Sequence, residues 1–354
     1  MLNKVKQAEA TNESGKEGPL PTMPRQFIKA SLKTAFKVAF AFGLIFWMIQ
    51  KGALDLRVFG RLATPSVIAA CAFMVFLQLF INNYRWLILL RGQGLQTNVR
   101  QTLPLTFIGL FFNFVMPGGV GGDVLKGYYL LQDHPRQRFA GAVSILVDRL
   151  VGFFVMIGTA FFALLFNWDS VSRSQELRSV SLATSLLFLC FILFFSLALS
   201  RRLGRKVFDG SFGRLIFEKL PGGSHLRRFY EQVHSYRDNP RAFFMATFLS
   251  VITQLPMVGF VYIVAISMGI TEIPLTVYFF LVPVGTVVTA LPISPAGIGV
   301  GQAAFYFLFS LYLGTSSQLG PTAATLMQAI NFCWGLLGAF FYLHRKKPAV
   351  PAEY

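Results

Sequence analysis

Five charged side chains lie within or beside strongly apolar stretches of this chain: Arg85, Asp123, Lys126, Asp148 and Arg149. A charged residue at the centre of a membrane helix costs about 2.5–3.5 kcal/mol on insertion scales. Such residues therefore normally face the interior of a helix bundle or a water-filled cavity. Inside a membrane they offer two kinds of chemistry, the binding of a charged group and its passage along a polar path.

Asp148 and Arg149 are neighbours in the apolar segment AGAVSILVDRLVGFFVM. If the helix enters the membrane near Phe139, a rise of about 1.5 Å per residue places Asp148 roughly 14 Å deep. Adjacent residues point about 100° apart on a helix, so we expect no ion pair between these two. Two interpretations remain open: they belong to a substrate pathway, or each pairs with another helix and fixes the packing.

Asp123 and Lys126 are three residues apart and so share one helical face. They follow a glycine cluster, where a helix N-terminus would offer free amides to an anion, and Lys126 would complete a phosphate-sized receptor. Alternatively, Asp123 is an ordinary acidic residue at a helix start, where the helix dipole favours it. Arg85, next to Trp86 in NNYRW, is either a snorkelling anchor at the membrane interface or a ligand for a lipid phosphate.

These side chains must be positioned by two Pro/Gly-rich interruptions, NFVMPGGVGGDVLKGYY at 113–129 and ALPISPAGIGVGQAAFY at 290–306. Aligned on Pro117 and Pro295, the two share further glycines and each has a tyrosine eleven residues on. Paired broken helices in the two halves of a membrane protein point to a substrate site. The residues expected to shape the breaks are Asn113, Pro117, Gly118, Gly119, Gly121 and Gly122 in the first, and Pro292, Pro295, Gly297, Gly299 and Gln302 in the second.

Polar side chains near the breaks have predicted roles in packing. Asn113 lies one turn before Pro117, where it would cap carbonyl groups freed by the break. Four amide side chains are expected to form hydrogen bonds between helices: Gln254, Gln302, Gln328 and Asn331.

The composition identifies the class of protein. Of 354 residues, 54% are hydrophobic and 13% are charged, with a mean hydropathy of +0.57, whereas soluble domains carry about 25% charged residues. We predict an all-α polytopic membrane protein with a single transmembrane domain at 29–343, between cytoplasmic tails at 1–28 (disordered) and 344–354. Six full spans are expected at about 30–50, 65–90, 139–167, 178–200, 242–269 and 321–343, and two broken hairpins at about 102–131 and 274–314.

The distribution of charge predicts the orientation. The segment Arg201–Arg241 has ten Lys/Arg and four Asp/Glu, so it and both termini are placed in the cytoplasm. Both flanks of the first broken element are then cytoplasmic and both flanks of the second are external, which makes the two hairpins inverted repeats that approach the midplane from opposite faces. Lys51, Arg57 and Arg61 in the predicted outer loop do not fit this scheme but are outnumbered.

The net charge of +17 predicts attraction to anionic lipid headgroups at the cytoplasmic face. Nucleic-acid binding is not expected, because the basic residues lack interleaved aromatic side chains. The three cysteines lie singly in apolar runs, and no GxSxG, HExxH or P-loop pattern is present. We therefore expect no metal, no cofactor and no catalytic constellation.

Four motifs, in order, carry a resemblance to a known family: NNYRWLILL, NFVMPGGVGGDVLKGYYLL, AVSILVDRLVG and LPISPAGIGVGQAAF. From about residue 30 to 343 the chain resembles the transmembrane, flippase-like region of lysylphosphatidylglycerol synthases. The resemblance implies a stand-alone bacterial inner-membrane protein that moves or presents lipids. Lysyl transfer is not expected, because no segment as long as the soluble synthase domain follows Leu343. Relatives usually have Arg-Glu where this chain has Gly301-Gln302, so the lipid need not be aminoacylated.

We expect a lipid translocase in which a phosphate-bearing headgroup passes through a polar groove between the breaks, passively or coupled to ions. Two alternatives remain. One is a membrane-embedded transferase acting on a lipid-linked sugar, with Asp123 or Asp148 as base. The other is a non-catalytic partner that organises a lipid-modifying complex through Arg201–Arg241.

Overall fold

The computed structural model describes residues 64–116, 121–171, 174–199 and 236–345, together with single residues at positions 43, 46, 50, 60, 232 and 234. The chain divides into units of residues 1–36 and 37–354, and every described residue belongs to the second. The predicted tail at 1–28, most of the predicted span at 30–50 and most of the basic loop lie outside the described residues, as do Pro117, Gly118 and Gly119.

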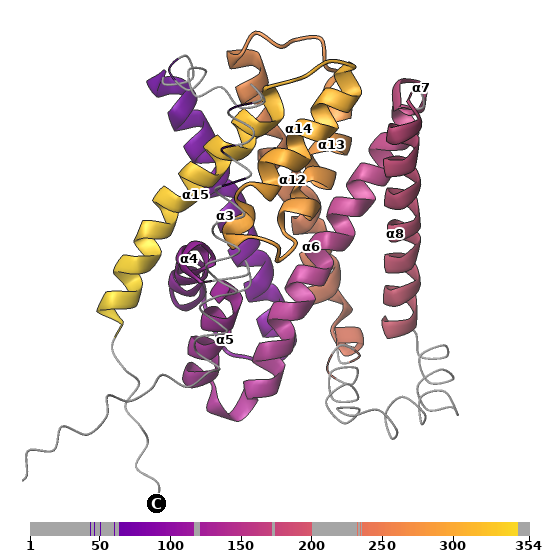
Figure 1. Ribbon diagram of the computed structural model, residues 1–354. Coiled ribbons are helices and arrows are strands. Elements are labelled where there is room, and N and C mark those ends of the chain that lie inside the picture. Colours follow the sequence, from indigo (N-terminus) through magenta and orange to yellow (C-terminus); the bar gives the residue numbers. More distant parts are fainter. Residues whose placement is uncertain are drawn as a thin grey trace, which may run out of the picture. The chain divides into compact units, whose positions relative to one another are not determined.

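All regular structure in the described part is helical, as predicted (Figure 1). In chain order the elements are α3 (Pro65–Gly92), α4 (Val99–Val115), α5 (Gly121–Asp133), η1 (Pro135–Gln137), α6 (Arg138–Phe166), α7 (Trp168–Val171), α8 (Gln175–Leu199), η2 (Tyr236–Asp238), α12 (Pro240–Ser267), α13 (Leu275–Thr289), η3 (Pro295–Gly297), α14 (Val300–Leu313) and α15 (Leu319–His344).

Six described stretches are long and apolar enough to cross a membrane: Pro65–Gly92, Pro135–Phe166, Gln175–Ala198, Pro240–Ser267, Pro295–Leu313 and Leu319–His344. Five of them confirm predicted spans, and the chain is a multi-pass membrane protein. The sequence predicts the sixth stretch, Pro295–Leu313, as half of a broken element. In the structure η3 and α14 together reach 19 residues, which is long enough for a membrane span. The first helix of each broken element, α4 in one and α13 in the other, is a shorter apolar helix.

The two interruptions end and restart helices where the sequence predicted. Helix α4 ends at Val115 and α5 begins at Gly121, while α13 ends at Thr289 and α14 begins at Val300. Gly121 and its aligned partner Gly299 therefore both stand at a helix start. Gly299 has a φ of 81° there, a left-handed conformation that glycine adopts without strain.

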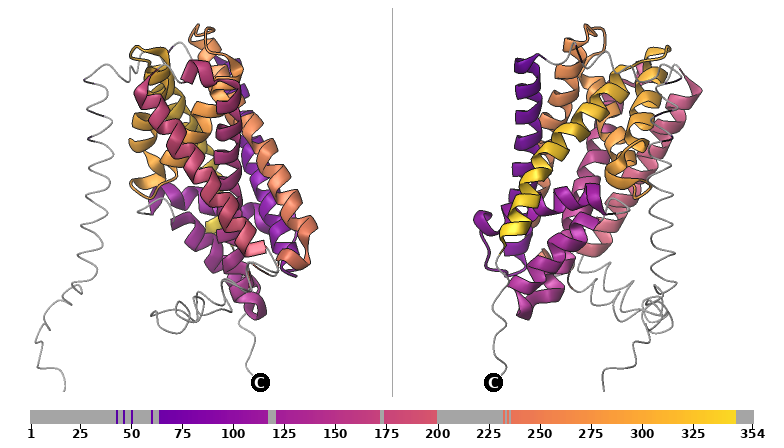
Figure 2. Two further views of the ribbon diagram at one scale, coloured as in Figure 1. Left: turned by 90° about the vertical axis from the view of Figure 1, so that its right-hand side faces the viewer. Right: turned by 60° about the vertical axis from the view of Figure 1, so that its left-hand side comes forward.

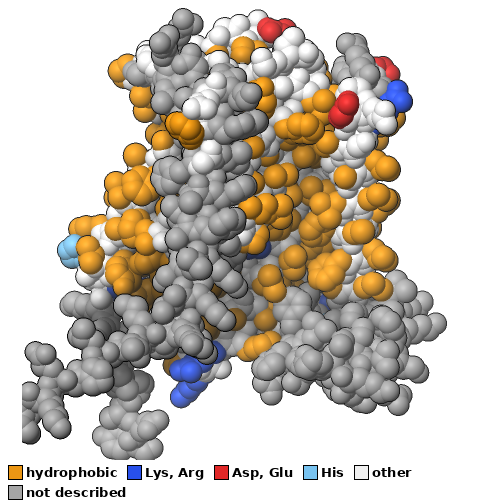
Figure 3. All heavy atoms as spheres, viewed as in Figure 1, with side chains coloured by type: hydrophobic (Ala, Val, Ile, Leu, Met, Phe, Trp, Pro, Cys, Tyr) orange, Lys and Arg blue, Asp and Glu red, His pale blue; other side chains and the backbone are white. Residues whose placement is uncertain are grey.

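The helices of the broken elements lie at different heights along the longer helices. In Figure 1, α13 and α14 occupy the upper half of the bundle and α4 and α5 the lower half. The long helices α6 and α15 pass beside both pairs: α15 packs against α4 and α14, and α6 packs against α5 and α13 (Figure 2). On the face drawn in Figure 3, the described side chains between the two ends are mostly apolar, as a lipid-facing surface requires.

Glycines allow the backbones of neighbouring helices to approach closely, as is common between membrane helices. A Cβ atom on Gly338 of α15 would lie 2.0 Å from the carbonyl oxygen of Phe107 of α4. The same substitution at Gly259 of α12 would meet only the Sδ atom of Met74, at 3.7 Å. Gly338 thus sets the separation of α4 and α15, whereas Gly259 does not limit helix packing.

We expect Gly338→Ala to destabilise the protein by about 1–3 kcal/mol, because the methyl group forces α4 and α15 apart. Gly259→Ala is the matched control and should be neutral or stabilising by about 0.5–1 kcal/mol, since alanine is the better helix former. Thermal unfolding of both variants in detergent measures the difference. Equal melting temperatures would show that the α4–α15 contact is not tightly packed.

Candidate functional site

A cavity of about 310 Å³ lies where the two broken elements approach each other. Its walls come from α4, α6, α13, η3, α14 and α15, so both interruptions contribute. The polar side chains that line it are those of Asn113, Arg149, Thr286, Thr289, Gln328 and Asn331. The remaining lining is apolar or backbone, including Ala296 and Gly297 of η3. Irregular backbone at membrane depth is tolerated where it is buried in protein or lines a water-filled cavity, and η3 lines this one.

Arg149 of α6 brings a positive charge to this cavity. Its Nε atom donates a hydrogen bond to Oδ2 of Asp123, in the first turn of α5. The two side chains are 28% and 20% exposed, respectively, so the pair is accessible from outside the packed core. An accessible guanidinium can exchange one oxyanion partner for another, because carboxylate and phosphate present similar acceptor geometry.

Arg85 of α3 forms a more deeply buried ion pair with Asp148 of α6. Nε and Nη2 of Arg85 donate to the two carboxylate oxygens at 2.8 Å and 3.1 Å, and Nη1 donates to Oγ of Ser250 at 3.1 Å. The two side chains are only 9% and 12% exposed. The interpretation of Arg85 as a snorkelling anchor is therefore wrong, because its guanidinium is buried and bonded to side chains of α6 and α12.

Asp148 and Arg149 thus pair with two different helices, as their 100° separation on α6 predicted. Asp148 pairs with Arg85 of α3, whose guanidinium also donates to Ser250 of α12, whereas Arg149 faces α5 and the cavity. The interpretation of packing between helices fits Asp148, since both of its carboxylate oxygens accept hydrogen bonds from Arg85. Arg149 also has a pairing partner, but its side chain is partly exposed and lines the cavity.

Lys126 is also buried, at 8% exposure. Its Nζ atom lies 3.6 Å from the centroid of the Trp86 ring, a cation–π contact, and the indole Nε1 of Trp86 donates to Oγ of Ser144 at 3.3 Å. Trp86 is fully buried, so like Arg85 it is not a side chain that reaches out to the lipid headgroups. Lys126 does not line the cavity and lies one helical turn farther along α5 than Gly122.

The first break is bridged by Asn113, although not in the predicted way. Its Oδ1 atom accepts the backbone N–H of Gly122 at 3.0 Å, so it satisfies an amide at the start of α5 instead of a carbonyl. Gly122 is required at this point because a Cβ atom would lie 1.8 Å from the carbonyl oxygen of Gly109 in α4. The ends of α4 and α5 are thereby held together across the interruption.

The second break is held by Gln302 of α14. Its Oε1 atom accepts the N–H of Gly299 at 2.7 Å, and its Nε2 atom donates to Gln328 of α15 at 2.6 Å. Gln328 in turn donates to the carbonyl of Ala296 at 3.4 Å. The prediction of hydrogen bonds between helices is confirmed for Gln302 and Gln328.

Two other amides differ from that prediction. Gln254 and Asn331 donate to carbonyls of their own helices, those of Ser250 and Met327. Of the two prolines that the sequence assigns to this break, Pro295 is buried in η3 and Pro292 is exposed. Ala296 has a φ of 48°, an uncommon left-handed conformation for a residue with a side chain, at a position that lines the cavity.

Sequence reasoning missed Ser144, Ser250 and Thr289. The two serines complete the hydrogen bonding of Trp86 and Arg85, and Thr289 packs against Gly297 and lines the cavity. Serine and threonine are common inside membrane helices, where their hydroxyls bond to carbonyls one turn back, so a single sequence carries no signal that distinguishes these three.

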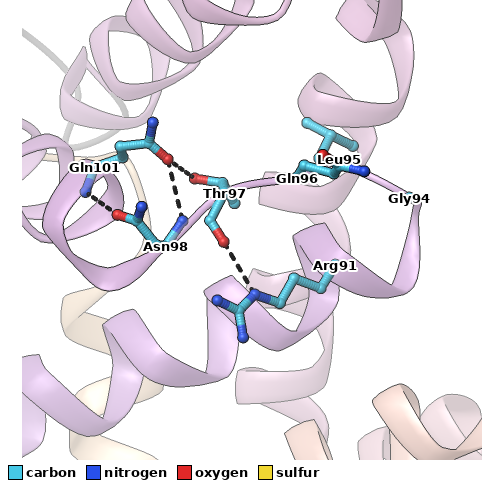
Figure 4. A pocket seen from close by; sticks show the side chains of 7 residues that line it. All are labelled: Arg91, Gly94, Leu95, Gln96, Thr97, Asn98 and Gln101. Carbon is cyan, nitrogen blue, oxygen red and sulfur yellow. Dashed lines mark hydrogen bonds between the residues drawn. The ribbon is translucent and has the colours of Figure 1, made fainter.

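Two further hollows have a different character. One of about 630 Å³ lies at the turn between α3 and α4 (Figure 4). There Nε of Arg91 donates to the carbonyl of Thr97 at 3.0 Å, and Asn98 and Gln101 form a reciprocal cap at the start of α4. These bonds shape the turn. The other hollow, of about 480 Å³, is lined mainly by apolar side chains of α6, α8, α12 and α13.

Among the described residues, no group of three or more His, Cys, Asp or Glu side chains is placed to hold a metal ion. Comparison with curated proteins finds no match, and neither does comparison with solved structures. The model of one protein family, described as the lysylphosphatidylglycerol synthase TM region, matches residues 34–338. That match spans most of the sequence and every residue that lines the cavity, and the chain therefore belongs to the lysylphosphatidylglycerol synthase TM region family.

Proposed function

We propose that this protein moves or presents a phosphate-bearing lipid headgroup across the bacterial inner membrane, through the cavity between its two broken elements. Membership of the family indicates a function connected with membrane lipids. The observation that carries the finer proposal is the cavity of about 310 Å³, which is lined by both breaks and by the side chain of Arg149. A headgroup would cross there while its acyl chains remain in the surrounding lipid.

In this proposal the two broken elements are re-entrant hairpins in inverted arrangement. Helices α4 and α5 contact each other closely through Gly109 and Gly122, and α13 and α14 also pack together. The two pairs lie in opposite halves of the bundle in Figure 1. Hairpins that reach the midplane from opposite faces would leave only a short barrier between two water-accessible sides. With the segment Arg201–Arg241 in the cytoplasm, α4 and α5 belong to the cytoplasmic half.

Arg149 is the proposed phosphate ligand. A guanidinium binds phosphate oxygens in the same forked geometry as it binds a carboxylate. Asp123 is then the internal ligand that occupies Arg149 between substrates. The pair is partly exposed, so exchange of its partner does not require the removal of a charge from a fully dry site.

The remaining lining would complete the path for a polar headgroup. Asn113, Thr289, Gln328 and Asn331 offer donors and acceptors on three sides of the cavity. At the second break, Gly297 lines the cavity, and because it has no side chain a ligand can approach its backbone closely. No nucleotide-binding motif is present in the sequence, so we propose that movement is passive or coupled to an ion gradient.

Reconstitution tests this proposal. Purified protein in liposomes should speed the exchange of fluorescently labelled phospholipids between leaflets, measured by reduction of the outer-leaflet label with dithionite. Liposomes without protein and liposomes with an unrelated six-span membrane protein provide the baseline. A panel of phospholipids that includes phosphatidylglycerol, phosphatidylethanolamine and a lipid-linked sugar should contain at least one accelerated species. A rate at the baseline for every member of the panel would contradict the proposal.

A further inference from the structure

The side chains in and around the two ion pairs carry more positive than negative charges. Among the described residues, the buried charged side chains are Arg85, Lys126 and Asp148, and the partly exposed pair of Arg149 and Asp123 adjoins them. Three cations and two carboxylates leave one positive charge. Both oxygens of Asp148 are engaged by Arg85, and Asp123 is engaged by Arg149, so Lys126 is the surplus cation.

The positive charge of Lys126 is opposed by its burial and by the cations Arg85 and Arg149, and it is stabilised by the face of Trp86 and by the carboxylates of Asp148 and Asp123. The cation–π contact gives the ammonium group no hydrogen-bond acceptor of opposite charge, whereas a carboxylate would supply both the acceptor and the charge. The carboxylates that act on Lys126 electrostatically are Asp148 and Asp123. Asp148 is held by a bidentate bond, and Asp123 by a single partner that reaches the cavity.

Asp123 and Lys126 are three residues apart on α5, so their side chains are neighbours on one face of the helix. An acidic and a basic side chain at this spacing can form an ion pair on the helix surface. Asp123 therefore has a second cation available on its own helix, besides Arg149.

We propose that Lys126 receives the carboxylate of Asp123 when a substrate phosphate takes Arg149, and that the site therefore selects headgroups with a net negative charge. This inference rests on the proposed function. In the loaded state both cations are paired, and the surplus positive charge is neutralised by the substrate. A zwitterionic headgroup leaves one charge unbalanced in a low-dielectric site, and a headgroup with a net positive charge adds another.

Lys126 is in this account a positioning residue, because it acts through Asp123 and does not line the cavity. Its charge should thus determine which headgroup is preferred, while Arg149 determines whether any phosphate is bound. The two roles can be separated by experiment.

The test measures binding of short-chain phosphatidylglycerol (net charge −1) and phosphatidylethanolamine (zwitterionic) to the purified full-length protein in nanodiscs. The wild type should bind phosphatidylglycerol about tenfold more tightly, and Lys126→Gln should abolish that preference, whereas Lys126→Arg should retain it. Arg241→Gln, which removes an exposed cation at the start of α12, is the matched control and should leave the preference unchanged.

If Lys126→Gln does not fold, a second variant tests the same exchange. Asp123→Asn leaves both Lys126 and Arg149 without their carboxylate, so it should tighten phosphatidylglycerol binding about tenfold. An unchanged preference in folded Lys126→Gln, or weaker phosphatidylglycerol binding in Asp123→Asn, would overturn the exchange. If one of these results is obtained and Arg149→Gln still abolishes movement of lipid, the carboxylate exchange is wrong but the proposed function stands. A wild type that binds neither lipid would instead overturn the proposed function itself.

Discussion

Arg149→Gln is expected to reduce protein-dependent headgroup movement by roughly a hundredfold, because it removes the only described cation that lines the cavity. Truncating one partner of a charged, hydrogen-bonded contact to a ligand typically costs about 2–5 kcal/mol of binding. The fold should survive, since the pair with Asp123 is partly exposed and is therefore less costly to break than a fully buried pair. The measurement is the initial rate of leaflet exchange in proteoliposomes, with thermal unfolding as the check on folding.

Two further variants test whether the position and geometry of the Arg149 charge cause this effect. Arg149→Lys keeps the charge but loses the forked geometry, so its rate should lie between those of the wild type and Arg149→Gln. Arg241→Gln removes a positive charge that is exposed and far along the chain from the cavity, and it should retain the wild-type rate. A folded Arg149→Gln protein with the wild-type rate would show that the cavity is not the path of the headgroup.

Asp148→Ala is expected to lower the free energy of unfolding by about 3–5 kcal/mol, a defect of folding and not of transport alone. The substitution leaves the guanidinium of Arg85 buried and without its carboxylate, and only the bond to Ser250 remains. An uncompensated buried charge is far more costly than an absent ion pair. The expected effect is a large drop in melting temperature in detergent and a poor yield of folded protein.

The double variant Arg85→Met/Asp148→Leu distinguishes the charge from the packing. Replacing both members by apolar side chains of similar volume removes the uncompensated charge, so much of the lost stability should return. Ser250 would then lose its donor but keep its own bond to the carbonyl of Ala246. If the double variant were no more stable than Asp148→Ala, the pair would matter for reasons other than charge compensation. A stable Asp148→Ala would show that the pair is not needed for folding at all.

The spans and the breaks could be predicted because each rests on a local property of the sequence. Long apolar runs between basic segments predict membrane helices, and Pro and Gly interrupt them at fixed positions. The observed restarts at Gly121 and Val300 therefore agree with the aligned motifs. The exception is Pro295–Leu313: composition alone does not show that η3 would extend α14 to the length of a span.

The pairing of charges could be predicted only in part. The geometry of one helix shows that Asp148 and Arg149 point apart, but it does not show which helices they meet. The partner of Asp148 lies 63 residues away in Arg85, and that of Arg149 lies 26 residues away in Asp123. Arg85 was misinterpreted because an arginine next to a tryptophan near the end of an apolar run is typical of an interface. Both side chains are instead buried against other helices of the bundle.

The same limit applies to the amide side chains. Gln302 and Gln328 bridge two helices, whereas Gln254 bonds within its own, although all three lie in similar apolar surroundings. Which contact forms depends on the separation and rotation of the helices, and close approaches such as that of Gly320 to the backbone of Phe305 set those quantities. These separations cannot be read from a single sequence.

The most direct measurement is a density map of the full-length protein in nanodiscs that contain phosphatidylglycerol. The account predicts headgroup density in the cavity between α4 and η3, with phosphate oxygens within hydrogen-bond distance of the Arg149 guanidinium and the carboxylate of Asp123 turned toward Lys126. Headgroup density confined to the two membrane surfaces, with Arg149 still bound to Asp123 and the cavity filled by protein side chains, would contradict it.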